Sequence, residues 1–435
     1  MKVIKIYQSR LYLAIASLFV FQVLSAQDEN KGNDNVQNEY SVERQLKISV
    51  PQILFSGVLL QNEEKKQVWY IPNAFELFPA NTVEGFVFNP QVRFTKNFED
   101  GRFYSLTPNV RYGFGNERLQ AQLKTQYFYN PKKNGLLELS GGRAIEQLYG
   151  ESTLSALNNT MYTFAFEENF LKIYERTYVE LGHTFSPIKD FLLSTNVSWN
   201  ERNPLENLTK YEADEGFTSN NPENLELSDT GFTKNTAVLF EAELRWQIGH
   251  EQIKERGQLI SEGKYPALTL SYTNAFDDIL GSDIAYQKLA FSIQDDFEIG
   301  HYSFGRTFIE IGDFLSQDNL TFVDFKHFKG KETVYGTYDI DQFQLLEYYQ
   351  HSTTNFYVQG HYEHYFRPFY FIYDELNYRP VAGVHYLYTE TGGHYAELGL
   401  GMDKMFKGKW RVDLYNGWRD GKHESFGVRV GFSVD

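Results

Sequence analysis

The chain has 435 residues, no cysteine and a formal net charge of −16 at pH 7. The acidic balance argues against nucleic acid as a partner, and the lack of cysteine excludes disulfides, thiolate metal sites and cysteine nucleophiles. Phenylalanine and tyrosine are abundant, at 37 and 31 residues, yet the mean hydropathy of −0.47 is hydrophilic. This combination favours a transmembrane β-barrel, in which aromatic side chains meet the lipid interfaces and polar side chains line the interior.

The N-terminal region has the pattern of an exported protein. In residues 1–26, three basic residues precede an apolar run from Leu11 to Leu24, and small residues follow up to Ala26. This run is shorter than the roughly 20 residues of a spanning helix, so we expect a signal peptide that is cleaved near Ala26. Residues 27–40 are almost entirely polar and are expected to form a disordered linker. Residues 41–83 are interpreted as a periplasmic lead-in segment with one or two strands.

From residue 84 to residue 435 the chain repeats segments of about ten residues with alternating polarity, each closed by turn-forming residues. The clearest examples are Arg118–Tyr129 and Thr236–Ile248, in which apolar and polar side chains alternate and therefore point to opposite faces of a strand. Tryptophans near segment ends, such as Trp199, are typical of the interfacial belts of membrane proteins. The sequence therefore predicts an all-β, antiparallel transmembrane barrel of about 16 strands.

Three stretches interrupt this alternation. Ala144–Lys172 has apolar residues at helical spacing and is expected to form a helix and turn, outside the strand ladder or against the lumen. Asn203–Asn235 is polar and suits a long extracellular loop, and Lys329–Gln350 is interpreted as another loop or an inward fold. The chain is expected to end on a barrel-closing strand, Ser425–Ser433, with Arg429 toward the lumen. The predicted lipid-facing residues of this strand are Phe426, Val428, Val430 and Phe432.

One pair of residues is a candidate for chemistry. His361 and Glu363 lie two residues apart on a predicted strand and therefore on one face, where such a pair can bind a metal or act as acid and base. A polar strand facing the lumen explains the same pattern, and we favour that interpretation. The carboxylates of Glu241 and Glu243 are likewise read as a solvated lumen wall.

Other signs of catalysis are missing from the sequence. No Gly-x-Ser-x-Gly elbow, Gly-rich phosphate loop or His-Glu-x-x-His motif is present. The sequence therefore indicates no cofactor and no metal. The balance favours a protein that is not an enzyme, and the question stays open.

A family resemblance is carried by three runs of residues: Phe78–Gly85, Glu168–Glu175, and Phe343–Glu347 followed by Tyr357–Phe366. Together they resemble an uncharacterised outer-membrane barrel family of Bacteroidota, whose members often begin with a carboxypeptidase-regulatory-like domain. The resemblance implies a barrel similar to the surface-antigen class and implies no catalytic residues. Only about 50 residues separate the expected signal peptide from the first run, too few for the regulatory-like domain and a linker.

We therefore expect an integral protein of the cell outer membrane that acts in transport, translocation or envelope assembly. Its expected partners are outer-membrane lipid, the barrel-assembly machinery during insertion and, as a candidate, another envelope protein. One alternative is a structural or adhesion barrel that acts through the loop Asn203–Asn235. The other alternative is a barrel-embedded hydrolase, for which His361 and Glu363 are the residues to test.

Overall fold

The described part of the chain begins after the expected targeting segments. The computed structural model describes residues 52–150, 154, 156–208, 211, 217–249, 251–255, 258–262, 266–370 and 377–432. The expected signal peptide (1–26) and linker (27–40) lie outside the described residues. Among the helices that are described, none is both long enough and apolar enough to cross a membrane.

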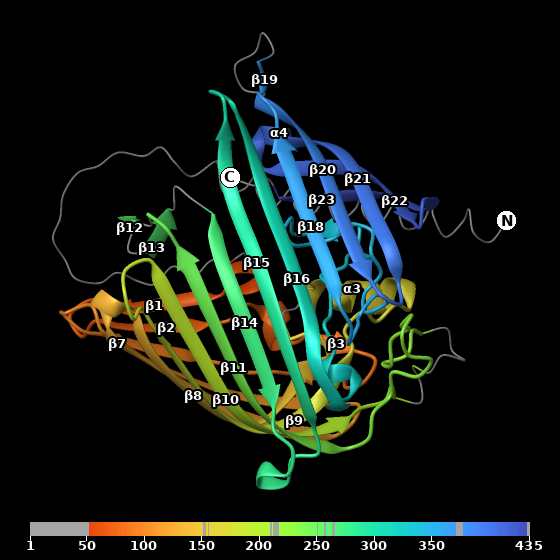
Figure 1. The fold of residues 1–435 in the computed structure, drawn as a ribbon. Coiled ribbons are helices and arrows are strands. Elements are labelled where there is room, and N and C mark those ends of the chain that lie inside the picture. Colours follow the sequence, from red (N-terminus) through yellow and green to blue (C-terminus); the bar gives the residue numbers. More distant parts are fainter. Residues whose placement is uncertain are drawn as a thin grey trace.

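Most described residues belong to one curved β-sheet of 21 strands (Figure 1). In the order in which neighbours pair, the main strands are β1 (Val58–Asn62), β2 (Gln67–Ile71), β5 (Arg93–Asn97), β6 (Phe103–Gly113), β7 (Arg118–Asn130), β8 (Gly135–Gln147), β9 (Ile173–Phe185), β10 (Phe191–Pro204), β11 (Asn235–Gln247), β14 (Ala267–Ala275), β15 (Ala285–Ile299), β16 (Ser303–Asn319), β18 (Tyr357–Tyr365), β20 (Asn377–Thr389), β21 (Gly393–Lys404), β22 (Trp410–Arg419) and β23 (Lys422–Phe432). Each main strand is antiparallel to the next. The predicted all-β barrel fold is confirmed, and the number of main strands is close to the predicted value of about 16.

Shorter elements complete the fold. The short strands of the sheet are β3 (Ala80–Asn81), β4 (Gly85–Phe88), β17 (Tyr335–Gly336) and β19 (Phe369–Tyr370), and β12 (Glu251–Glu255) and β13 (Gln258–Glu262) form a separate hairpin. The helical segments are η2 (Gln52–Ser56), α2 (Ala74–Leu77), η3 (Pro131–Lys133), α3 (Ala156–Phe166), η6 (Ile279–Gly281), η7 (Phe322–Asp324) and α4 (Met405–Gly408).

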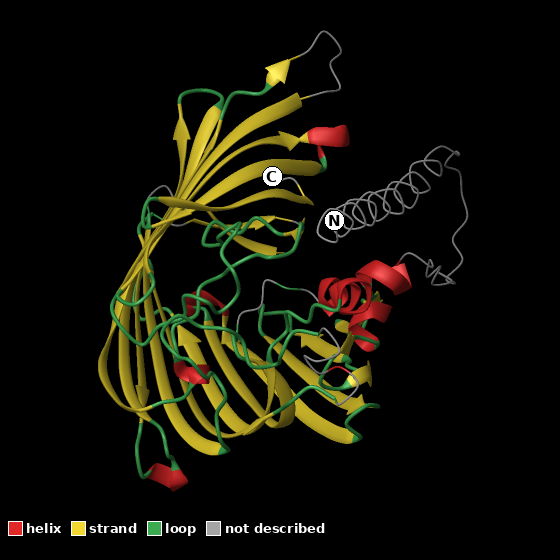
Figure 2. Cartoon of the chain, turned by 90° about the vertical axis from the view of Figure 1, so that its right-hand side faces the viewer, coloured by secondary structure: helices red, strands yellow, loops and turns green. Residues whose placement is uncertain are grey.

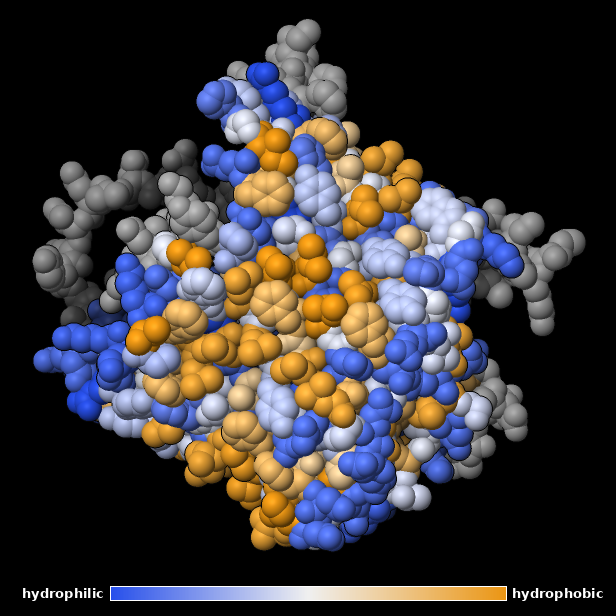
Figure 3. All heavy atoms as spheres, viewed as in Figure 1, coloured by the Kyte–Doolittle hydropathy of each residue, from blue (hydrophilic) through white to orange (hydrophobic). Residues whose placement is uncertain are grey.

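The two faces of the sheet differ in polarity because successive side chains of a strand point to opposite faces. On β7, Leu119 and Leu123 are exposed on the outer face, whereas Gln120 between them is buried on the inner face. The last strand follows its prediction, since Phe426 and Phe432 are exposed and Arg429 is buried. Figure 3 shows hydrophobic side chains gathered over the outer face of the strands in the centre of the view. An apolar outer face of this extent is typical of a surface that meets lipid.

The sheet is not closed into a complete ring. Among the described strands, no pairing joins β23 to β1, and Figure 2 shows the sheet open on one side, with short helices at the opening. We call this interval between β23 and the first strands the seam. The strands β1 and β2 precede residue 84 but pair with β5 in the same sheet, so the sheet begins earlier than expected.

Three long connections leave the same end of the sheet. They join β8 to β9 (residues 148–172), β10 to β11 (205–234) and β16 to β18 (320–356). Their common end follows from the antiparallel order, because β8, β10 and β16 run in the same direction. The expected helix in Ala144–Lys172 is confirmed only as α3, since β8 continues to Gln147.

Candidate functional site: the lumen plug and its wall

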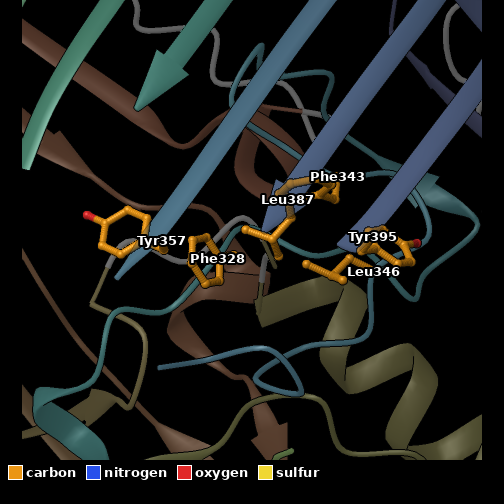
Figure 4. Packing of buried hydrophobic residues seen from close by; sticks show 6 residues of the cluster. All are labelled: Phe328, Phe343, Leu346, Tyr357, Leu387 and Tyr395. Carbon is orange, nitrogen blue, oxygen red and sulfur yellow. The ribbon is translucent and has the colours of Figure 1, made fainter. Parts of the chain in front are cut away.

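Apart from α3, the described residues of the three long connections, within 148–172, 205–234 and 320–356, fold inward and form what we call the plug. One apolar contact of the plug is made by the third connection with the inner faces of β18, β20 and β21 (Figure 4). The residues of this contact are Phe328, Phe343 and Leu346 from the plug and Tyr357, Leu387 and Tyr395 from the strands. All are nearly inaccessible to solvent, so the plug is packed against the wall as a core and does not hang loosely in the lumen.

A buried carboxylate on β21 fixes the third connection. Glu397 has no exposed surface, and its Oε2 accepts a hydrogen bond from the backbone N–H of Gln344 at 2.6 Å. Its Oε1 accepts from the N–H groups of Leu345 at 2.7 Å and Leu346 at 2.9 Å, and from the hydroxyl of Tyr395 at 2.8 Å. Hydrogen bonds to an ionised carboxylate are stronger than neutral ones, so Glu397 stabilises one conformation of this backbone segment.

An arginine on β23 holds the same connection through its carbonyl groups. The guanidinium of Arg429 donates to the carbonyl oxygens of Gln344 and Lys331. Lys331 in turn donates from Nζ to the carbonyl of Thr337 at 2.9 Å. Next to this contact, β17 pairs in parallel with β23. The third connection is therefore attached to the last strand as well as to β21.

A buried charge network lies beside this attachment on the inner wall. The guanidinium of Arg411 (β22) donates to Glu363 Oε1, Asp413 Oδ2 and the Tyr365 hydroxyl, each at 2.7 Å. Its Cζ also lies 4.0 Å from the ring centroid of Tyr338 in the plug. Buried charges require such partners because each lost its hydration on folding. The network thus joins β18 and β22 to each other and to the plug.

The candidate pair His361 and Glu363 lies within this wall. Both side chains are buried on the inner face of β18, as the alternation predicted. The Nδ1 atom of His361 lies 2.9 Å from Nδ1 of His385 on β20, and its ring centroid lies 4.5 Å from that of Phe343. Glu363 is instead engaged by Arg411. The two side chains therefore share a face but contact different partners beneath the plug.

The second connection was expected to be an outward loop, and the structure corrects this. Within residues 205–234, the amide of Asn224 donates to the carbonyls of Tyr349, Gln350 and Ser352 in the third connection. The amide of Asn220 likewise donates to the carbonyls of Ile173 and Leu205, so these two side chains satisfy backbone groups of the plug and the adjoining strand, whereas other polar residues of the segment, such as Glu223, stay exposed. A polar segment can form its hydrogen bonds either with water or with buried backbone groups. Its composition is the same in both cases, which is why the sequence suggested a solvated loop.

Further contacts unite the connections with each other and with the strands. The carboxylate of Glu226 accepts from the hydroxyls of Thr353 and Thr354 at 2.5 and 2.6 Å. At the end of β10, Arg202 and Asp324 form a buried ion pair at 2.7 Å. The inward-fold interpretation of Lys329–Gln350 is confirmed, and the plug extends well beyond it.

The opposite wall, on β7 to β14, is lined by water-accessible polar groups. A cavity of about 330 Å³ lies there. Its charged lining residues are Lys124, Glu138, Glu180, Glu241 and Glu243. Glu241 and Glu243 thus occupy a solvated wall, in agreement with the interpretation from sequence. Among the described residues, no group of three His, Asp or Glu side chains is placed to hold a metal ion.

Sequence reasoning did not single out Glu397, Arg411 and His385 of the wall, and it placed Arg429 inward without identifying its role in holding the plug. Each occupies an inward position of an alternating strand. A charged or imidazole side chain does not stand out there, because the inner wall of a barrel is expected to be polar. The only available signal was this inward position, which many lumen residues share. Their partners lie up to about a hundred residues away in the chain, so no local motif marks them.

The sequence matches the family model described as "Family of unknown function (DUF5686) C-terminal domain" over residues 51–402. A comparison with curated protein sequences finds no match. Similar solved structures include BamA from Haemophilus ducreyi lacking POTRA domains 1–3, with 12% identity, a TM-score of 0.44, and coverage of 87% of this chain and 74% of that one.

Two further solved structures are similar. CdiB from Acinetobacter baumannii has 10% identity and a TM-score of 0.37, with coverage of 82% of this chain and 57% of that one. A triple mutant of the Rhodopseudomonas blastica porin has 9% identity and a TM-score of 0.35, with coverage of 79% and 90%.

Proposed function

The chain belongs to the DUF5686 family of unknown function, and we propose that it acts in the outer membrane as a gated barrel in translocation or envelope assembly. The plug is the observation that carries this proposal. It is packed on the wall as a core and is held by Glu397 and Arg429 through buried hydrogen bonds. A lumen occupied in this way does not suit free diffusion, so passage requires movement of the plug.

The composition of the lumen supports a polar cargo or a polar partner segment. Four carboxylates, Glu138, Glu180, Glu241 and Glu243, line the cavity on the wall of β7 to β14, with Lys124 as the basic residue among its charged lining. A wall with four carboxylates and one ammonium group is predominantly acidic, and such a wall concentrates cations and favours positively charged segments. When the plug moves, we therefore expect cations or basic polypeptide segments to pass this wall more readily than anions.

The seam supports envelope assembly as the more specific role. No strand pairing joins β23 to β1 among the described strands, so hydrogen-bonded strands do not separate the lumen from the membrane on that side. A barrel with such a seam can exchange material with the membrane plane as well as across it. A simple pore has no need of this arrangement, because full closure removes the exposed strand edges.

The alternatives receive less support. A hydrolase that uses His361 and Glu363 needs access for its substrate, and both residues are buried beneath the plug and bound to the wall. We propose that they stabilise the wall instead. An adhesin needs outward loops, but Asn224 and Glu226 attach the second connection to the third connection.

Planar-bilayer conductance tests the gated barrel. We compare the wild type with Glu397→Gln, which removes the charge that binds three backbone N–H groups, and with Glu243→Gln as a control on the solvated wall. We expect the wild type to be closed most of the time and Glu397→Gln to open at least several-fold more often, because a net loss of about 1.5–3 kcal/mol accompanies a lost charged hydrogen bond. We expect Glu243→Gln to leave the opening frequency unchanged.

Two results would contradict the proposal. A wild type that conducts steadily through a large open pore would show that the plug does not gate the lumen. Equal opening of Glu397→Gln and the wild type, in preparations that are equally folded on a gel, would show that this attachment does not control passage.

A further inference from the structure

The helix α3 (Ala156–Phe166) has a composition that is unusual for a helix exposed to water. Its sequence, ALNNTMYTFAF, contains no charged residue. Met161 is 39% exposed and Phe164 is 50% exposed, and the two lie three residues apart on the same side of the helix. A surface helix of a soluble protein typically carries charged and polar residues on its exposed side. The exposed side of α3 therefore suits an apolar environment.

This exposed side continues into the outer face of the first strands. The ring of Phe164 stacks on that of Phe86 in β4, with 5.5 Å between centroids, and Phe86 is itself 63% exposed. Phe114, at the end of β6, donates its backbone N–H to the carbonyl of Phe86 and is also exposed. We call this surface the seam patch. It consists of Phe78, Phe86, Phe88, Phe114, Met161 and Phe164.

Hydrogen bonds hold the opposite side of α3 against the protein, so the helix cannot rotate and its apolar side faces outward. The hydroxyl of Thr160 both accepts from the N–H of Ala80 and donates to its carbonyl, each at 3.1 Å. Asn159 is fully buried, and its Oδ1 accepts from the N–H groups of Phe170 and Leu171. These contacts attach the helix to β3 and to its own connection, and they leave the apolar side outward.

The position of α3 relates this patch to the seam. Through Ala80 the helix is attached to the first strands, and the hydroxyl of Tyr162 accepts a hydrogen bond at 2.9 Å from the N–H of Val334 in the plug. Val334 accepts from the N–H of Val430 on β23 at 2.9 Å. A chain of direct contacts therefore runs from β3, which pairs with β4 among the first strands, through α3 and the plug to β23 on the other side of the seam.

We propose that α3 lies in the acyl-chain region of the membrane and that the seam patch is a lipid-binding surface. Part of the seam is then closed by a membrane-embedded helix in place of a strand pair. The occupant is lipid because the patch carries no charge and is continuous with the apolar outer face of β4 and β6, which a barrel presents to lipid. This inference rests on the proposed location in the outer membrane.

The absence of cysteine from the chain allows a direct test with single-cysteine variants. A spin label is attached at Phe164→Cys or Met161→Cys on the patch, at Leu181→Cys on the outer face of β9, and at Glu243→Cys on the solvated wall. The full chain is placed in phosphatidylcholine and phosphatidylglycerol vesicles, and collisions with oxygen, which partitions into lipid, and with a water-soluble nickel chelate are measured. Each variant is first checked for the gel mobility of the folded wild type.

We expect both patch labels to resemble Leu181→Cys, with an oxygen-to-nickel accessibility ratio several-fold above that of Glu243→Cys. Patch labels that behave like Glu243→Cys, while Leu181→Cys reports lipid, would overturn the inference and leave the barrel proposal intact. Patch labels that neither reagent reaches would also overturn it, since a protein surface would then cover the patch. If Leu181→Cys itself reports water, the membrane location fails and the inference fails with it.

Discussion

At the scale of single residues, burial in the plug has moved two ionisable groups toward their neutral forms. Burial raises the pKa of Glu332 from 4.5 to about 7, and it lowers the pKa of Lys172 from 10.5 to about 8. Glu332 accepts a hydrogen bond from the N–H of Tyr348 at 2.9 Å, and the Lys172 ammonium donates to the carbonyls of Asn169 and Ser219 at 2.6 Å. The stability of the plug should therefore depend on pH.

The sign of this dependence follows from the pKa of Glu332. Its folded pKa lies above the unfolded one, so its contribution to stability is fully present below about pH 4.5 and is lost as the pH rises through about 7, at about 1.4 kcal/mol per unit of pKa difference. Lys172 is protonated in the folded and the unfolded state over most of this pH range, so it changes the pH dependence of stability little. We expect hydrogen exchange of the plug amides, corrected for the intrinsic rate, to show less protection at pH 7.5 than at pH 5.

The matched variants are Glu332→Gln and Glu223→Gln, the second at an exposed carboxylate of the plug. The first should remove the difference between pH 5 and pH 7.5, and the second should keep it. An unchanged pH dependence in Glu332→Gln would assign the effect to other groups.

At the scale of elements, the three connections between strands depend on one another. Each is rich in polar residues, and each satisfies its polar groups through the others, as Asn224 does for three carbonyls of the third connection. The buried pair Arg202–Asp324 joins the end of β10 to the third connection in a similar way. A substitution that destabilises one connection should therefore destabilise another connection as well.

The variant Asn224→Ala tests this dependence. It leaves the carbonyls of Tyr349, Gln350 and Ser352 without their amide donor, which costs about 1–3 kcal/mol for buried polar groups that lose their partner. We expect faster proteolytic cleavage near residues 349–352, far from the substitution in sequence. Asn221→Ala, at an exposed amide three residues earlier, is the control and should leave the cleavage rate unchanged. Cleavage confined to residues 205–234 would contradict the dependence.

At the scale of the whole molecule, an antiparallel sheet surrounds a lumen whose two sides differ. The plug is packed as a core against β18, β20 and β21 and also against Tyr174 of β9, whereas a polar cavity lies along another part of the wall, on β7 to β14. The outer face is apolar around most of the circumference and the seam interrupts the strand pairing.

A membrane barrel of this kind should be heat-modifiable. We expect the detergent-refolded chain to migrate faster on a gel before boiling than after it, because the hydrogen-bonded sheet resists detergent until it is heated. The measurement is gel mobility as a function of temperature, together with solubility in buffer without detergent. Full solubility in plain buffer and no change of mobility on boiling would refute the membrane barrel.

The sequence by itself determined the strands and their two faces, because the alternation of side chains has a period of two that local backbone geometry imposes. For this reason it placed Arg429 inward and His361 beside Glu363 correctly. Only the tertiary structure decided that the polar connection around Asn224 turns into the lumen, that Glu397 binds the backbone at Gln344, and that the sheet leaves a seam. These contacts join residues that are distant in the chain. Burial of such a polar group is favourable only when its hydrogen-bond partner is buried with it, and the local sequence does not show which groups become partners.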